Sequence, residues 1–234
     1  MVKGYKISTP FFEFGPKAYL YGEKLLDLIK KIDGFADKYD MDVIADVQTT
    51  DLRLIAENTS ERIHVYAQHM DSIPVGRGMG TILPEAVKAT GAVGVMLNHA
   101  ECKLTLEEVE KAIKRADEVG LATIVCADKE DEIKAIAKMN PNILVAEPSE
   151  LIGTGIAVGR EYVDACINLV KSVNPDIMVL PSAGISCGQD CYNIIKAGAD
   201  GSGSSSGICK APDPAAMAEE MMAAVRRAYD EREK

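Results

Sequence analysis

The sequence has 234 residues, of which 47% are hydrophobic and 26% are charged, and its formal net charge is -10 at pH 7. This composition excludes disordered and fibrous chains and leaves enough apolar residues for one sizeable core. The acidic excess argues against broad electrostatic binding of nucleic acid or of anionic membranes, so an anionic small molecule would need a local binding site.

Apolar periodicity predicts strands and helices that alternate along the whole chain. The predicted strands cover residues 7–14, 43–47, 63–68, 92–97, 121–126, 143–146, 177–180 and 199–203. The predicted helices cover residues 20–39, 51–58, 84–90, 106–119, 129–139, 161–173, 189–197 and 214–232. Most of the strands are apolar throughout, which is typical of strands that are buried on both faces of a parallel sheet.

Two of the predicted helices have recognisable capping residues. Thr105 precedes the helix at 106–119 and Glu108 follows three residues later, which is the pattern of a capping box. Gly120 stands directly after the last turn of the same helix, where glycine commonly ends a helix. Asp213 is expected to cap the start of the last helix. These residues set the start of both helices and the end of the first.

Eight strands that alternate with eight helices predict a closed (β/α)8 TIM barrel of the α/β class, with residues 1–234 in a single domain. A doubly wound open sheet is the alternative. The sequence shows no linker, and its one low-complexity stretch is G-S-G-S-S-S-G at 201–207. In a barrel of this type the βα loops form the functional face, so residues that follow strand ends are candidates for a site.

The candidates that follow strand ends are Lys17, Gln68, His99, Glu101, Glu147, Gly184, Ser186 and the run 201–207. Glu147 ends an apolar strand and precedes a segment that begins with Pro148 and closes with G-T-G at 153–155. This arrangement would hold a carboxylate under a hinged loop, and partial burial would raise its pKa toward that of a general base. The alternative is a solvated carboxylate at the rim.

The other candidates have both functional and structural interpretations. His99 leads into a helical segment whose amides would favour its neutral form, but it could equally be a packed or capping residue. We expect His64 and His69 to be structural and Gln68 to be a hydrogen-bond donor beside the site. The run at 201–207 is either a flexible loop or a cradle of backbone N–H groups for a phosphate.

The six cysteines are scattered and form no C-x-x-C pair, so the sequence predicts reduced thiols and no structural zinc site. Cys187 and Cys191 are four residues apart on a predicted helix, but a chain with three histidines offers few further ligands, and no metal is expected. The N-terminus lacks the apolar stretch of a signal peptide, and no apolar run approaches the roughly 18 residues that span a bilayer. We therefore expect a cytoplasmic protein that does not bind membranes.

Six motifs occur in order over most of the chain, from about residue 60 onward. They are Y-A-Q-H-M-D at 66–71, L-P-E-A-V-K at 83–88, M-L-N-H-A-E at 96–101, A-D-E-V-G-L-A-T-I-V-C at 116–126, A-E-P-S-E-L-I-G-T-G at 146–155 and A-G-I-S at 183–186. Together these motifs resemble the triosephosphate isomerase family, in its short, archaeal-like branch. The resemblance implies a cofactor-free isomerase of glycolysis and gluconeogenesis that interconverts glyceraldehyde 3-phosphate and dihydroxyacetone phosphate through an enediolate.

The resemblance also assigns roles to individual residues. It implies that Glu147 is the proton-abstracting base, that His99 is a neutral electrophile, and that Lys17 supplies positive charge for the anionic substrate. It places Glu101 in the site as an acid two residues beyond His99, and it makes 148–154 a lid. The substrate-binding residues that it implies are Gly15, Lys17, Ile152, Gly153, Gly184, Ser186, Ser205 and Ser206.

The N-terminal part departs from the family pattern. The family ends its first strand with N-x-K, whereas Gly15, Pro16 and Lys17 stand here, so an asparagine side chain near the reacting carbons is missing. Ala100 replaces a family serine. Three functions stay open: triosephosphate isomerase, a paralogous isomerase of a tetrulose phosphate such as erythrulose phosphate, and a non-catalytic barrel that binds a phosphometabolite. The resemblance further implies a homo-oligomer, either a dimer or a tetramer.

Overall fold

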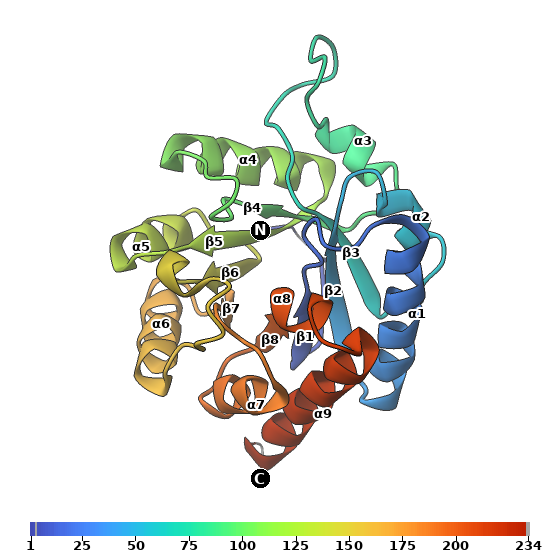
Figure 1. The fold of residues 1–234 in the computed structure, drawn as a ribbon. Helices are drawn as coiled ribbons and strands as arrows, with labels where there is room; N and C mark the ends of the chain where they lie inside the picture. Colours follow the sequence, from blue (N-terminus) through green and yellow to red (C-terminus); the bar gives the residue numbers. More distant parts are fainter. Residues whose placement is uncertain (3, 233–234) are drawn as a thin grey trace.

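The computed structural model describes residues 1–2 and 4–232, and its eight parallel strands form a barrel (Figure 1). The strands are β1 (Phe11–Phe14), β2 (Asp42–Val47), β3 (Ile63–Ala67), β4 (Gly94–Leu97), β5 (Ala122–Ala127), β6 (Ile143–Ala146), β7 (Met178–Pro181) and β8 (Gly201–Ser204). Each strand pairs with the next from β1 to β7, and β8 pairs with β1. The Asp200 amide donates to the Val179 carbonyl over 3.1 Å, which links β7 to β8. The predicted barrel is confirmed, and the open sheet is wrong.

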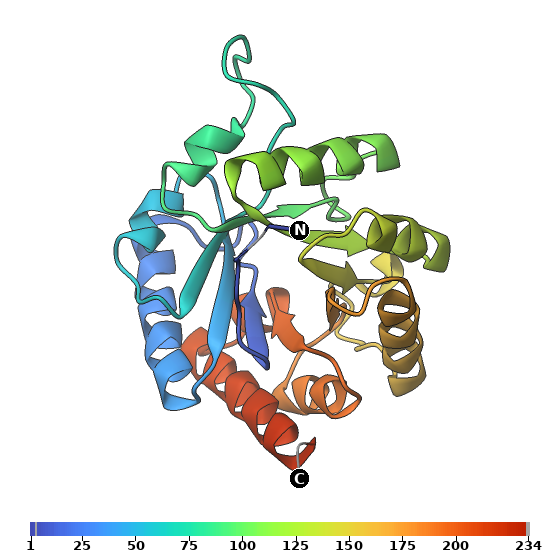
Figure 2. The same cartoon turned by 180° about the vertical axis from the view of Figure 1, so that it is seen from behind.

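Helices surround the barrel on its outside in both views (Figure 1, Figure 2). They are α1 (Gly22–Lys38), α2 (Leu52–Ala56), α3 (Pro84–Lys88), α4 (Leu106–Val119), α5 (Glu130–Lys138), α6 (Arg160–Val173), α7 (Gly188–Lys196), α8 (Ser206–Cys209) and α9 (Pro214–Arg232), with a 3-10 helix at Ser149–Leu151. Every predicted helix is present; α4 and α9 have the predicted bounds, and the ends of the others differ by a few residues. The sequence did not predict α8 or the 3-10 helix, because such short stretches show no helical periodicity. Among the described residues, none of these helices has the length and apolarity that crossing a bilayer requires.

The helix α4 begins and ends where its capping residues predict. The hydroxyl of Thr105 accepts a hydrogen bond from the Glu108 amide at 3.2 Å, and Oε2 of Glu108 accepts one from the Thr105 amide at 2.8 Å. Gly120 follows with a φ of 74°, a left-handed conformation that glycine adopts without strain. Oδ1 of Asp213 accepts hydrogen bonds from the amides two and three residues later, so Asp213 caps α9 as predicted.

Strand side chains fill two separate apolar cores. The larger core lies between the strands and the surrounding helices, and the smaller core fills the barrel interior. The buried residues of the interior core are Phe11, Ile44, Tyr66, Ala122, Ile124, Cys126, Ile143, Val145 and Leu180. Because the strands contact apolar neighbours on both faces, they appear in the sequence as continuous apolar runs. Tyr5 and Ile7 pack against the interior core from the N-terminal segment.

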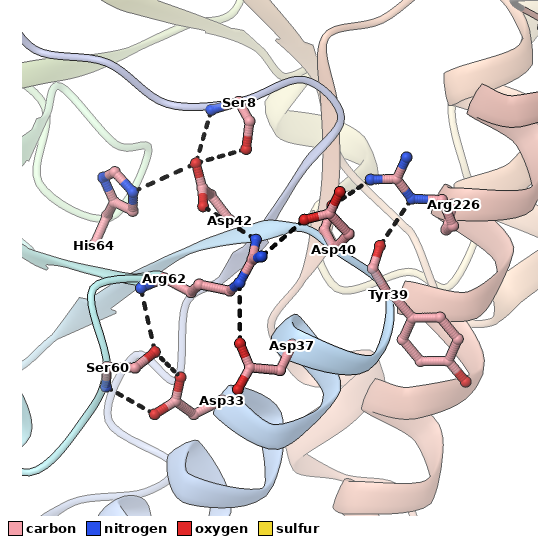
Figure 3. Close-up of polar contacts among 10 residues, drawn as sticks. All are labelled: Ser8, Asp33, Asp37, Tyr39, Asp40, Asp42, Ser60, Arg62, His64 and Arg226. Atoms are coloured by element: carbon pink, nitrogen blue, oxygen red, sulfur yellow. Dashed lines mark hydrogen bonds and ion pairs between the residues drawn. The ribbon is translucent and has the colours of Figure 1, made fainter.

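A polar network ties the amino-terminal ends of β2 and β3 to their surroundings (Figure 3). Asp42 accepts hydrogen bonds from the amide and the hydroxyl of Ser8 at 2.7 and 2.6 Å, and Nε2 of His64 lies 3.7 Å from Oδ2 of Asp42. Arg62 pairs with Asp40 at 2.7 Å. Because the network lies at the end of the barrel opposite the βα loops, His64 has the structural role expected for it.

The strand β8 has the sequence G-S-G-S, and all four residues are buried. A Cβ at Gly201 would lie 2.4 Å from a ring carbon of Phe11, and a Cβ at Gly203 would lie 2.1 Å from the carbonyl oxygen of Glu13. Because these two glycines have no side chain, the Phe11 ring and the Glu13 carbonyl of the neighbouring strand β1 can pack directly against their backbone. The short eighth strand is present as predicted, whereas a flexible loop over 201–207 is wrong, because the run forms β8 and the start of α8.

Candidate active site

A cavity of about 740 Å³ opens at the carboxyl-terminal ends of the strands, on the face formed by the βα loops. Its lining includes every site residue expected from the sequence, namely Gly15, Lys17, His99, Glu101, Glu147, Ile152, Gly153, Gly184, Ser186, Ser205 and Ser206. These residues follow five different strands, β1, β4, β6, β7 and β8. The barrel therefore brings together side chains that are far apart in the sequence.

Glu147 follows β6 directly. Its amide donates a hydrogen bond to the carbonyl of Ala127 at 2.9 Å. This bond extends the pairing of β5 and β6 and fixes the backbone from which the side chain projects. The side chain is only 12% exposed. Burial raises the pKa of Glu147 to about 7, although the positive charge of Lys17 acts in the opposite direction. A carboxylate with this pKa can both accept and release a proton near neutral pH.

His99 faces Glu147 in the cavity, with 3.7 Å between Nε2 of His99 and Oε2 of Glu147. Nδ1 of His99 accepts a hydrogen bond from the Glu101 amide at 3.1 Å, so the single ring proton of the neutral form lies on Nε2. Burial and the nearby charge of Lys17 lower the pKa of His99. The ring is therefore neutral near pH 7 and presents an N–H donor to the cavity.

The backbone before His99 is held in place by Asn98, whose φ is 59°. The side-chain amide of Asn98 donates to the Cys126 carbonyl at 2.8 Å and to Oε1 of Glu132 at 3.0 Å. Its side-chain oxygen accepts a hydrogen bond from the Leu104 amide at 3.0 Å. These bonds tie the loop after β4 to β5 and α5. Asn98 was not among the candidates from the sequence, although asparagine is a residue that tolerates this conformation.

Lys17 lies in the loop after β1 with a φ of 49°, a conformation that is unfavourable for a residue with a long side chain. Its carbonyl accepts hydrogen bonds from Nε2 of Gln48 at 3.2 Å and from Nε2 of Gln68 at 3.1 Å, which stabilise this loop. Nζ of Lys17 donates to Oε1 of Glu101 at 2.6 Å, and this bond lowers the pKa of Glu101. Gln68 is thus a donor beside the site, as expected. Gln48 was not among the candidates from the sequence, although it follows β2 as Gln68 follows β3.

The segment after Glu147 borders the cavity and has the features of a hinged loop. Its first part is the 3-10 helix at Ser149–Leu151, where the Ser149 hydroxyl donates to Oδ2 of Asp128 at 2.6 Å. Gly153 and Gly155 have φ angles of 73° and 74°, which glycine adopts readily. A short helix followed by two flexible positions suits a lid that opens and closes over a ligand.

The wall of the cavity next to this segment consists of the loops after β7 and β8. Gly184 has a φ of 69°, and a Cβ there would lie 1.9 Å from the carbonyl oxygen of Ile156, so glycine is required beside the lid. The amide and the hydroxyl of Ser186 donate to Oδ2 of Asp190 at 2.9 and 3.1 Å. Residues 205–206 stand at the start of α8, where the first N–H groups have no partner within the helix. Backbone amides of this kind can bind phosphate oxygens.

A third histidine, His69, lies at the rim of the cavity. Its Nδ1 is 3.7 Å from the thiol of Cys102, and its Nε2 is 3.6 Å from Oδ1 of Asp71. His69 therefore joins the loops after β3 and β4, as a structural residue would. All six cysteines are free thiols, and the described residues contain no group of three histidine, cysteine or carboxylate side chains that could hold a metal ion.

Comparison with known proteins agrees with this geometry. The family model for triosephosphate isomerase matches residues 15–221. A protein named triosephosphate isomerase from Methanobacterium bryantii is 39% identical over 211 residues, which cover 88% of this chain and 92% of the relative. Its namesakes from Sulfurisphaera tokodaii and Methanothermus fervidus are 35% and 37% identical; the matches cover 96% and 86% of this chain and 99% and 91% of those proteins. The chain belongs to the triosephosphate isomerase family.

Proposed function

We propose that Glu147, His99 and Lys17 carry the triosephosphate isomerase activity of this chain, which is the interconversion of glyceraldehyde 3-phosphate and dihydroxyacetone phosphate. The observation that carries the proposal is the 3.7 Å approach of His99 Nε2 to Glu147 Oε2 inside a cavity that Lys17 also lines. A buried base and a neutral N–H donor that face each other can act on adjacent atoms of one small substrate.

In the proposed mechanism Glu147 removes a proton from carbon 1 of dihydroxyacetone phosphate. The electron pair of that C–H bond forms a C=C bond, and the carbonyl oxygen on carbon 2 becomes negative. His99 donates its Nε2 proton in a hydrogen bond to this oxygen, and the charge of Lys17 stabilises it further. Glu147 then returns the proton to carbon 2, while the hydroxyl proton moves from oxygen 1 to oxygen 2. Preorganised donors of this kind contribute roughly 3 to 4 kcal/mol each at oxyanion sites.

The remaining residues that line the cavity bind and enclose the substrate in this proposal. The phosphate is held by the backbone at Gly184 and 205–206 with Ser186 beside it, and the lid residues Ile152 and Gly153 close over it. Closure excludes water from the enediolate, which protects the intermediate from side reactions. Two further residues act near the reacting carbons. Glu101 holds the ammonium of Lys17 through their 2.6 Å hydrogen bond, and the backbone of Gly15 lines the cavity.

Three measurements test this function against its alternatives. The purified chain should interconvert the two triose phosphates in coupled assays, and erythrulose phosphates should be much poorer substrates. Incubation with dihydroxyacetone phosphate in D2O should place deuterium on carbon 1. A chain that binds the triose phosphate without any deuterium exchange would be a non-catalytic binder, whereas a preference for the tetrulose phosphate would indicate the paralogous isomerase.

We expect kcat/KM for glyceraldehyde 3-phosphate to rise with pH and to reach half of its plateau at about pH 7. Glu147 must be ionised to accept a proton, and because its pKa is raised, the active base is lost as the pH falls through that value. The profile should be measured between about pH 5 and 9 with the coupling enzyme in excess. A rate that stays constant between about pH 6 and 8 would contradict the raised pKa of Glu147, because an ordinary glutamate titrates near 4.3 and is fully ionised over this range.

We also propose that the chain forms a homo-oligomer through the loop between β3 and α3, which projects from the barrel (Figure 1). Val75 and Met79 on this loop are 71% and 104% exposed. The base of the loop is closed by two hydrogen bonds, from the Asp71 amide to the Ile82 carbonyl at 3.0 Å and from the Ile82 amide to Oδ2 of Asp71 at 2.7 Å. Apolar side chains on an anchored, projecting loop are typical of a surface that contacts another protein chain.

Met79→Asp is therefore expected to lower the molecular mass in light scattering toward the 25.2 kDa of one chain. A carboxylate placed in an apolar contact loses its hydration without gaining a partner, which weakens association. Tyr21→Ser is the matched control, because Tyr21 is a large exposed side chain like Val75 and Met79 but lies at the start of α1. This variant should leave the mass unchanged. A wild-type protein that has the mass of a single chain in solution would contradict the proposal.

A further inference from the structure

The active-site cavity reaches down into the barrel, where two acidic side chains line it, Glu13 of β1 and Asp46 of β2. The two strands are neighbours, with Glu13 opposite Ile44 and the next residue of β1 opposite Ala45. Glu13 is 9% exposed and Asp46 is 1% exposed. Because both residues belong to strands and not to loops, they lie deeper in the barrel than Lys17 does. The catalytic proposal uses neither of them.

Two glycines make room for the carboxyl group of Glu13. A Cβ at Gly15 would lie 2.7 Å from Oε1 of Glu13, and a Cβ at Gly203 would lie 2.7 Å from Oε2. The backbone at Gly15 is not left-handed, so the contact with Glu13, and not the conformation, excludes a side chain there. The Glu13 carboxyl therefore fills the space that a side chain at position 15 would occupy beside the reacting carbons.

Both carboxyl oxygens of Asp46 are buried, and the side chain hydrogen-bonds to the carboxyl group of Glu13. Gln68 donates to the main-chain carbonyl of Asp46 at 2.9 Å, which fixes the backbone beside this pair. A hydrogen bond between two carboxyl groups occupies one oxygen of Glu13 and leaves its other oxygen able to accept a hydrogen bond. Because Glu13 lines the cavity, a polar ligand at this depth can supply that bond.

The two acids also have complementary protonation states. Burial raises the pKa of Asp46 well above its usual range, and the neighbouring Glu13 raises it further. Burial raises the pKa of Glu13 as well, but Asp46 and the positive charge of Lys17 oppose this. The pair therefore retains a proton that the two carboxyl groups share, and Glu13 keeps an oxygen that accepts hydrogen bonds. A hydroxyl group can donate to this oxygen.

We propose that Glu13 and Asp46 form a hydroxyl-binding subsite at the base of the active-site cavity, in which Glu13 contacts the hydroxyl-bearing end of a bound sugar phosphate. Asp46 is a positioning residue that holds Glu13 through the shared proton. The inference rests on the proposed function, which places the phosphate at the loops after β7 and β8. A cation is a poorer occupant, because the positive charge of Lys17 already acts on Glu13.

The test compares two unreactive ligands, glycerol 3-phosphate and propyl phosphate, which share the phosphate and differ in their hydroxyl groups. In calorimetry the wild-type chain should bind glycerol 3-phosphate at least about tenfold more tightly than propyl phosphate, and the ratio of the two affinities reports the subsite. Glu13→Met keeps the side-chain length but removes both oxygens, so this ratio should fall to about threefold while the affinity for propyl phosphate is unchanged. Glu13→Gln keeps an acceptor oxygen and should retain most of the ratio.

Two further variants disturb the subsite without removing Glu13. The Cβ of Gly15→Ala should displace the Glu13 carboxyl and lower the ratio as Glu13→Met does. Asp46→Asn keeps a donor for Glu13 and should preserve the ratio, whereas Asp46→Leu should lose it, which separates positioning from packing. Thermal unfolding reports whether each variant is folded, and Gly15→Ala serves as the decisive variant if Glu13→Met does not fold.

An unchanged ratio in folded Glu13→Met, or an equal loss of affinity for both ligands, would overturn the subsite. Because the two ligands do not react, this result is independent of the isomerase assay. A chain that isomerises triose phosphates without the predicted ratio loses the subsite alone. A chain that shows the ratio and its loss in Glu13→Met, but no turnover, supports the subsite and contradicts the catalytic proposal alone.

Discussion

Glu147→Gln is expected to lower kcat for the isomerisation by about 10³-fold or more, while the Kd for 2-phosphoglycolate changes by less than about threefold. Glutamine keeps the size and shape of the side chain but cannot accept a proton from carbon. The effect should appear in kcat because Glu147 is buried, has a pKa of about 7 and lies 3.7 Å from His99, which is the place of a base and not of a phosphate ligand. Steady-state kinetics and calorimetry measure the two quantities separately.

Glu147→Asp tests the position of the same carboxylate. The shorter side chain withdraws the base from the substrate carbon, and a misplacement of this size should reduce turnover by roughly 10²-fold, far more than it reduces affinity. Glu161→Gln is the control, because Glu161 is exposed at the start of α6 and should leave both quantities unchanged. Equal losses of turnover and affinity in the Glu147 variants would mean that Glu147 binds the substrate without taking its proton.

Periodicity and capping residues predict most of the fold. β6 and α4 have the bounds that the sequence indicates, because β6 is an isolated apolar run and α4 has caps at both ends. Other ends differ because burial extends beyond strand pairing: Ile177 is fully buried although β7 begins at the next residue. β8 was the hardest strand to predict, since its glycines and serines show no apolar pattern and their burial is set by the distant strand β1.

The sequence indicates some residues of the candidate site and does not reveal others. Glu147 and His99 follow apolar strands, so strand position and the resemblance both indicate them. Gln48 and Asn98 were missed because an amide side chain acquires its role from carbonyls that only the folded chain brings near. Glu13 stands in F-F-E-F, where alternation places it inside the barrel, but the sequence does not reveal that the interior at that depth is a cavity and not packed core.

His99→Ala is expected to cause the second largest loss, roughly 10²- to 10³-fold in kcat, because it removes a donor placed where negative charge develops. The Glu101 amide donates to Nδ1 of His99 at 3.1 Å, which leaves the ring proton on Nε2, and burial keeps the pKa of His99 low. The ring therefore acts as a neutral hydrogen-bond donor. Binding of 2-phosphoglycolate depends mainly on phosphate contacts and should weaken by less than about tenfold.

A second substitution decides whether His99 acts as a neutral donor or as a cation. His99→Gln keeps an N–H group and should recover part of the activity lost in His99→Ala, whereas it should recover none if a positive ring is required. The wild-type pH profile gives an independent answer, because a required imidazolium would make the rate fall as the pH rises, while the ionisation of Glu147 makes it rise. His69→Ala is the control at the rim of the same cavity and should change kcat by less than about threefold. Since the two pH dependences have opposite signs, a rate that rises through pH 7 and stays high above it is compatible only with a neutral ring.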